Sequence, residues 1–283
     1  LCFSCKETPS NVETQVNNPM TDSLLVYAAY TPDATDIILS RSDYKDRLYG
    51  FWLAQCIANW TGLVTEMDKI GIPKDGKGEG FYTREDWGKP DQPNLWGSNN
   101  YSETIDFLFA AEDSIWGADD DTDIEYIYQN LLYNNKTSVL TGEQIREGWL
   151  AHIKSEEENF LWVSNQTALN LMQEGMVPPA TSDPENNTDY EMIDAQLTTE
   201  IFGFFAPTRP DVALKMAHLP IQTVARQNAE WISEFNVIMY SLAPLADSNK
   251  SIKELFESYY TDVFASVSTV TTNIPIMSYL KND

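Results

Sequence analysis

The acidic run at residues 117–123 is the part of the chain whose residue types and spacing could most directly do chemistry. It reads GADDDTD, so four of the five positions 119–123 carry a carboxylate. Carboxylates this close repel one another, and a bound divalent cation is the usual compensation. The alternative is an N-cap aspartate with an acidic first turn, but it explains only one or two of the four side chains. We therefore predict a magnesium or manganese site at Asp119, Asp120 and Asp121.

A helix is expected directly after this run, and it must position the carboxylates. Ile124, Ile127, Leu131 and Leu132 follow the i, i+3, i+7, i+8 spacing of one buried helical face. The acidic run is therefore expected at the start of a packed element.

Composition limits the classes of function. The chain has 43 Asp and Glu against 18 Lys and Arg, for a net charge of −25, so neither a nucleic acid nor an anionic membrane is an expected partner. Only His152 and His218 are histidines, and neither lies in a ligand spacing. Both are expected at or near the surface, which disfavours a histidine-based triad or a histidine-rich zinc site. Carboxylates and oxygen-preferring cations remain as the expected chemistry.

The first residues suggest an export signal. LCFSCK resembles the end of a bacterial lipoprotein signal peptide, in which Cys5 would carry the lipid, and polar residues to about position 23 would form a tether. This predicts an extracytoplasmic, membrane-anchored protein. The alternative is a disordered N-terminus with two free thiols, Cys2 and Cys5. No stretch of the chain is apolar enough to span a bilayer, and Cys56 is expected in the core.

The remaining pattern predicts an all-α domain over residues 24–283, with residues 67–102 and 178–190 as loops and no strands. Gly50, Ala54, Ala58 and Gly62 recur every four residues, which predicts a central helix that others approach closely. A capping box is expected at Thr141. Besides the helix after the acidic run, helices are expected at about residues 46–66, 103–113, 141–155, 158–174, 190–205, 210–219, 221–245 and 251–268.

Three segments together resemble the ADP-ribosylglycohydrolase family, in a divergent bacterial branch. DRLYG at 46–50 with GLVTE at 62–66 is similar to its opening helix, and DDDT at 119–122 is similar to its TDDT motif. IDAQ at 193–196, Gly203 and APTRP at 206–210 are similar to a later helix and its APGNP turn. The resemblance covers about residues 44–245.

The resemblance implies a many-helix orthogonal bundle with a binuclear magnesium or manganese site that hydrolyses the C1 bond of an ADP-ribosyl or related ribosyl unit. Asp120 and Asp121 match metal ligands, whereas Asp119 stands where the family has threonine. Glu66 matches a glutamate near the scissile bond and is the expected catalytic residue. The expected substrate-binding residues are Asn59, which replaces an aspartate of the family, Thr122 and Asp123.

One departure from the family is large. A second acidic motif, DxDT, supplies the other half of its metal ligands, but after residue 240 this sequence offers only Asp247, Asp262 and Asp283. We expect a C-terminally incomplete domain, monomeric and inactive in isolation, whose natural substrate is a small molecule or an ADP-ribosylated protein. Two alternatives stay open. One is a non-catalytic surface lipoprotein that binds a nucleoside or sugar, and the other is a DDxxD enzyme similar to terpene synthases.

Overall fold

The computed structural model describes residue 34 and the ranges 38–63, 83–91, 103–106, 112–113, 119–154 and 161–245. The regular structure of these residues is helical, which confirms the predicted all-α class. Their one β pairing is an isolated antiparallel bridge between Pro90 and Thr104. No helix within these ranges is both long enough and apolar enough to cross a membrane.

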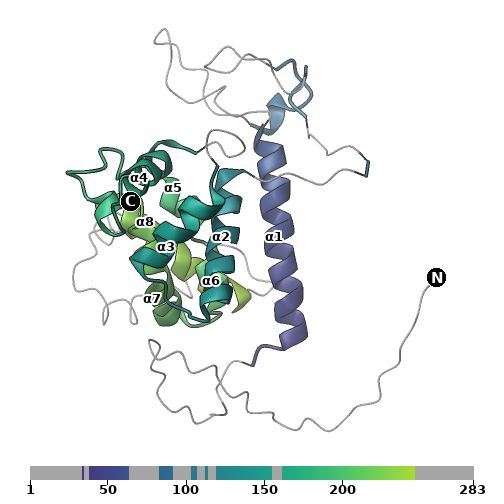
Figure 1. The fold of residues 1–283 in the computed structure, drawn as a ribbon. Coiled ribbons are helices and arrows are strands. Elements are labelled where there is room, and N and C mark those ends of the chain that lie inside the picture. The colour runs from purple at the N-terminus through teal and green to yellow at the C-terminus, as the bar shows by residue number, and fades with distance from the viewer. Residues whose placement is uncertain are drawn as a thin grey trace, which may run out of the picture.

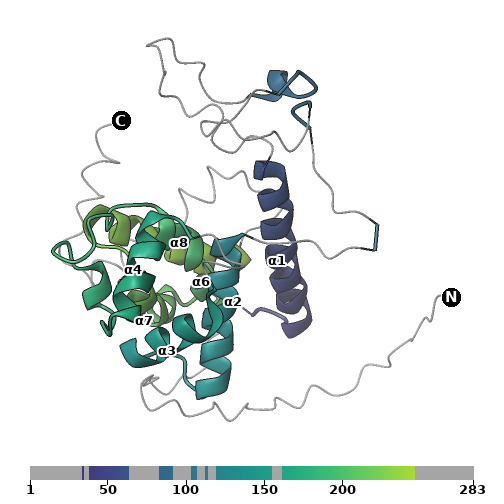
Figure 2. The same cartoon turned by 45° about the horizontal axis from the view of Figure 1, so that its top comes forward.

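The helices form a bundle with one long helix along its side. Helix α1 (Arg41–Leu63) stands next to α2 (Asp120–Asn135), and the other helices lie on the far side of α2 in both views (Figures 1 and 2). These are α3 (Gly142–His152), α4 (Val163–Gln173), α5 (Asp194–Thr198), α6 (Ile201–Phe205), α7 (Pro210–Ile221) and α8 (Gln227–Leu242). Short 3₁₀ turns occur at η1 (Arg84–Asp86), η2 (Ala180–Ser182) and η3 (Ala243–Leu245).

Helix α2 has the predicted start and the predicted buried face. Asp119 is its N-cap and accepts a hydrogen bond from the Thr122 amide at 3.0 Å. Ile124, Ile127 and Leu131 are buried in the core, as their spacing predicts. The acidic run is thus fixed to a packed helix.

Other helix ends also follow local sequence signals. Thr141 and Gln144 form the predicted capping box of α3, with hydrogen bonds of 3.2 and 2.9 Å. Gly175, at φ 102°, follows α4, because glycine tolerates a positive φ that other residues avoid. Pro210 opens α7, where its missing amide hydrogen costs nothing.

Helix α8 is the central element of the bundle and packs against α5, α6 and α7. Ala229, Ser233, Val237 and Ser241 recur every four residues along it and are buried. These small side chains let α6 approach so closely that a Cβ on Gly203 would lie 2.5 Å from the Val237 carbonyl oxygen. Glu200 lies directly before α6.

Three sequence expectations are corrected. The small residues of α1 are exposed rather than central, and a Cβ on Gly50 or Gly62 would meet no atom within 4 Å among the described residues. The core-facing side of α1 instead presents Phe51, whose ring centroid lies 4.2 Å from that of Phe204. The described part of the 103–113 segment is not helical, because its backbone pairs with residues 88–91. The helix expected at 190–205 is two short helices, α5 and α6, separated at residues 199–200.

The close contact between α6 and α8 generates a prediction. Gly203→Ala should lower the free energy of unfolding by about 1–3 kcal/mol, because the atoms that the new methyl group meets include rigid backbone atoms. Gly50→Ala is the matched control, and it should add about 0.5–1 kcal/mol, since Gly50 lies exposed inside a helix. Chemical denaturation measures both. Equal stability of Gly203→Ala and the parent would contradict the close approach.

Candidate metal centre

The three predicted ligands of the acidic run occupy different positions at the start of α2. Asp119 uses its Oδ1 atom to cap the helix, so the capping alternative holds for this residue. Asp120 and Asp121 lie in the first turn, and Asp120 Oδ2 accepts a hydrogen bond from the Trp162 amide at 3.2 Å. The segment that leads into α4 therefore closes over the acidic run.

A further carboxylate lies one turn into α2, on the side of the helix that faces the core. Glu125 is fully buried. Its Oε2 accepts a hydrogen bond from Gln55 Nε2 of α1 at 2.6 Å, and its Oε1 accepts one from the Ile201 amide of α6 at 2.9 Å. Three helices that are far apart in sequence thus meet at this carboxylate.

Two more carboxylates complete the group from the α5–α6 segment. Asp194 is buried at the start of α5, and its Oδ1 accepts a hydrogen bond from the Asn165 amide at 3.1 Å. Glu200 is buried between α5 and α6, where the charge of Glu125 raises its pKa and the two carboxyl groups share a hydrogen bond. We refer to the following set as the acidic cluster: Asp119, Asp120, Asp121, Glu125, Asp194 and Glu200.

Burial dominates the electrostatics of the acidic cluster. It raises the pKa of Asp121 to about 9 and the pKa of Asp120 to about 6, and neighbouring carboxylates add to both shifts. Burial also raises the pKa of Asp194. It likewise raises the pKa values of Glu125 and Glu200, and the charge of Glu125 raises that of Glu200 further. At neutral pH the cluster must therefore hold protons or gain a compensating cation.

Buried oxygens that accept no hydrogen bond indicate what could compensate the negative charge of the acidic cluster. Glu200 Oε2, Asp194 Oδ2 and Gln55 Oε1 are buried with no hydrogen-bond partner among the described residues. An unsatisfied buried polar atom costs about 1–3 kcal/mol. Carboxylate and amide oxygens are the ligands that magnesium, calcium and manganese prefer. The donor set thus fits a hard divalent cation.

The oxygens of the acidic cluster are not tightly gathered. Within the described ranges, a group of three side chains whose ligand atoms all lie within 4.8 Å of one another is found at His218, Glu230 and Glu234. The carboxylates of the acidic cluster would have to converge further by side-chain rotation to surround one ion.

The other predicted site residues have mixed outcomes. Asn59 Nδ2 donates to Thr122 Oγ1 at 3.1 Å, so the last turns of α1 contact the acidic run. Thr122 is buried, whereas Asp123 is exposed. Glu66, expected as the catalytic residue, and Cys5, expected as the lipid anchor, lie outside the described residues.

Sequence reasoning missed Glu125, Asp194 and Glu200 as members of the site. A signal existed for Glu125, because it lies four residues after Asp121 and next to Ile124 on a face expected to be buried. Asp194 and Glu200 gave no such signal. Their positions depend on the break between α5 and α6, which the helical pattern of residues 190–205 conceals.

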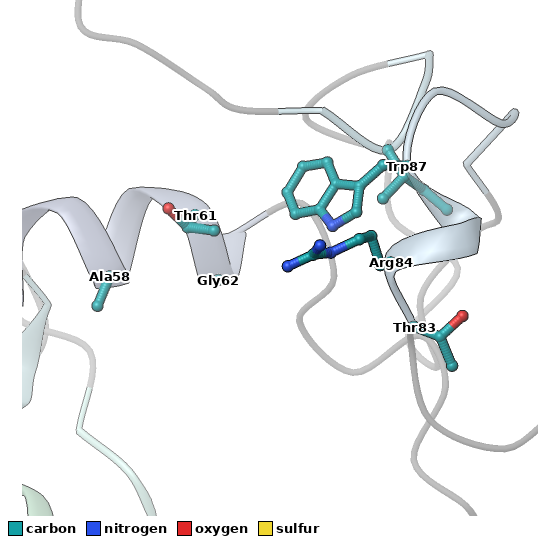
Figure 3. Close-up of a pocket in the computed structure, with 7 residues that line it drawn as sticks. Ala58, Thr61, Gly62, Thr83, Arg84 and Trp87 are labelled. Carbon is teal, nitrogen blue, oxygen red and sulfur yellow. The ribbon is translucent and has the colours of Figure 1, made fainter. Parts of the chain in front are cut away.

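An open pocket of about 520 Å³ lies at the end of α1 (Figure 3). Arg84 and Trp87 project from the η1 segment toward the last turn of α1. The α1 side is lined by Ala58, Thr61 and Gly62, next to Asn59, which contacts the acidic run. An indole face and a guanidinium together suit a flat, anionic ligand.

The raised pKa values predict how stability depends on pH without metal. Asp121 loses its proton at about pH 9 in the folded chain and near 3.8 in the unfolded chain. The folded state therefore binds the extra proton between these values, and stability falls as the pH rises. In EDTA, the free energy of unfolding should drop between about pH 5 and pH 9 by at least about 1.4 kcal/mol, the equivalent of one pKa unit.

Two variants separate this effect from general charge repulsion. Asp121→Asn should flatten most of the pH dependence. Asp211→Asn should leave it unchanged, because the hydrogen bond from Arg209 lowers the pKa of Asp211 and moves its titration below this range. A parent protein whose stability rises with pH in EDTA would show that Asp121 is ionised without a cation.

Comparison with known proteins gives no relative: no family model, no curated protein and no solved structure matches the chain. Its function has to be inferred from the chemistry of the acidic cluster and the residues around it.

Proposed function

We propose that the acidic cluster binds one or two divalent cations of the magnesium or manganese type and that the protein is a metal-dependent hydrolase of an ADP-ribosyl or related ribosyl bond. The observation that carries the proposal is the burial of Glu125 next to Glu200 and one turn from Asp121. Packing several ionised carboxylates together costs several kcal/mol unless they take up protons or a cation joins them. A cation also lets a negatively charged substrate approach a chain of charge −25.

The cluster offers ligands from two directions. Asp120 and Asp121 supply oxygens from the start of α2, and Asp194 and Glu200 supply oxygens from the α5–α6 segment. Asp194 and Glu200 are the candidates to replace the DxDT motif that the sequence lacks. Bound cations would hold ribose hydroxyls and lower the pKa of a water molecule. Asn59 and Gln55 orient Thr122 and Glu125, and Glu66 remains the proposed catalytic residue.

Two backbone features support placing the chain in the ADP-ribosylglycohydrolase family with its orthogonal bundle. Thr208 stands where the APGNP turn has glycine, and its φ is 62°. A β-branched residue rarely adopts this left-handed conformation, so the turn has the geometry of a glycine position. Gly203, which belongs to the same matched segment, is the close contact between α6 and α8. Both features are compatible with the resemblance of residues 193–210 to that family.

The hydrolase proposal is tested by release of ADP-ribose from ADP-ribosylated arginine or serine peptides in manganese and in EDTA. Asp121→Asn and Glu200→Gln should each lower kcat/KM by about 100-fold or more, since removing even an outer contact of a metal site costs about 10- to 100-fold. Asp183→Asn changes an exposed carboxylate and should leave activity unchanged. Hydrolysis that persists in EDTA at the manganese rate would contradict the proposal.

The pocket at the end of α1 favours a second candidate, a non-catalytic domain that binds a nucleoside or sugar ligand. Trp87 can stack on a base, and Arg84 can pair with a phosphate group. Binding of ADP-ribose and manganese without release of product would favour this candidate over the hydrolase.

The pocket generates a prediction that serves both candidates. Trp87→Ala should raise the Kd for ADP-ribose by about 5- to 150-fold, because stacking on a base contributes about 1–3 kcal/mol. Arg84→Ala should weaken ADP-ribose more than adenosine, since only the former carries phosphates. Tyr126→Ala removes an exposed aromatic side chain of α2 and should change neither. Calorimetry measures these affinities. If Trp87→Ala and the parent bind ADP-ribose equally well, the pocket is excluded as the ADP-ribose site.

A further inference from the structure

Three side chains with metal-binding chemistry converge between α7 and α8. His218 lies in the last turn of α7, and Glu230 and Glu234 lie one turn apart on α8. One histidine nitrogen and one oxygen of each carboxylate all lie within 4.8 Å of one another. His218 Nδ1 is 3.3 Å from Glu234 Oε1. None of these residues belongs to the acidic cluster.

Neighbouring residues orient the three side chains and leave His218 accessible to solvent. The Glu230 carboxylate accepts a hydrogen bond at 2.5 Å from Gln222 Nε2, and Gln222 is the C-cap of α7. The His218 side chain is 54% exposed, whereas that of Glu234 is 13% exposed. A cation can therefore reach the group from solvent and meet carboxylates already oriented by the packing of α7 against α8.

The local charges favour a divalent cation over an ion pair alone. Glu230 and Glu234 repel each other at their i, i+4 spacing. The C-terminal end of α7 adds a partial negative charge beside His218. Arg226 is the nearby basic group, but its Nη2 donates to the Pro179 carbonyl at 2.7 Å. A protonated imidazole supplies one positive charge for two carboxylates, and a divalent cation supplies two.

We propose that His218, Glu230 and Glu234 form a zinc site that links α7 to α8. An imidazole nitrogen with carboxylate oxygens suits zinc, whereas the all-oxygen acidic cluster suits magnesium or manganese. Zinc binds these atoms at about 2.0–2.2 Å, so the three ligands need only a small rotation to close on it. Three protein ligands leave the fourth position to water. The zinc site does not depend on the proposed hydrolase activity.

The two histidines allow a direct test by NMR. The imidazole signals of metal-free protein are followed at about pH 8 during titration with Zn²⁺. His152→Ala assigns the two sets of signals. Zinc should shift the His218 signals and leave those of His152, which is exposed at the end of α3, unchanged. Magnesium at the same concentration should shift neither. Because the readout is His218 itself, zinc bound by cysteines or by the acidic cluster does not interfere.

Variants of the carboxylates decide the outcome. Glu234→Gln should weaken zinc binding at His218 at least tenfold. Glu143→Gln, which changes an exposed carboxylate of α3, should leave the affinity unchanged. Circular dichroism checks that each variant keeps its helices. His218 signals that do not move in zinc, or that move equally in Glu234→Gln, would overturn the proposal.

Discussion

The fully buried carboxylate of Glu125 is the constraint on which the arrangement of this bundle depends. Its two oxygens accept hydrogen bonds from α1 and from the start of α6, so it joins the long side helix to the helices around α8. Burying a carboxylate costs several kcal/mol, and the charge of Glu125 in turn raises the pKa of the neighbouring Glu200. Buried carboxyl groups with strongly shifted pKa values concentrate at functional sites, so the acidic cluster is the candidate site.

The fold around the cluster explains how this arrangement is maintained. Small side chains along α8 let α6, which follows Glu200, approach closely, and the Asp119 cap fixes the first turn of α2. The aromatic contact between Phe51 and Phe204 holds α1 against the same region. Rigid elements thus bring acidic side chains together that would otherwise repel one another. A cation coordinated by carboxylates of both segments would offset this repulsion and join α2 to the α5–α6 segment.

Local sequence signals predicted local structure well and long-range contacts less well. The Asp119 cap, the buried face of α2 and the Thr141 capping box depend on neighbouring residues, and all were predictable. The small-residue spacing of α1 suggested a central helix, but the close approach occurs on α8, because spacing alone does not say which helix another element meets. Half of the acidic cluster was missed for the same reason. Glu125, Asp194 and Glu200 become one group only through tertiary packing.

The central claim is that the acidic cluster is a divalent-cation site, and anomalous diffraction from crystals grown with manganese tests it most directly. The account predicts a manganese peak between the carboxylates of Asp120 and Asp121 and those of Asp194 and Glu200, with oxygens at about 2.0–2.6 Å. Crystals of Asp121→Asn should lose or weaken that peak. Crystals of the parent protein that show no manganese peak at the acidic cluster would contradict the claim.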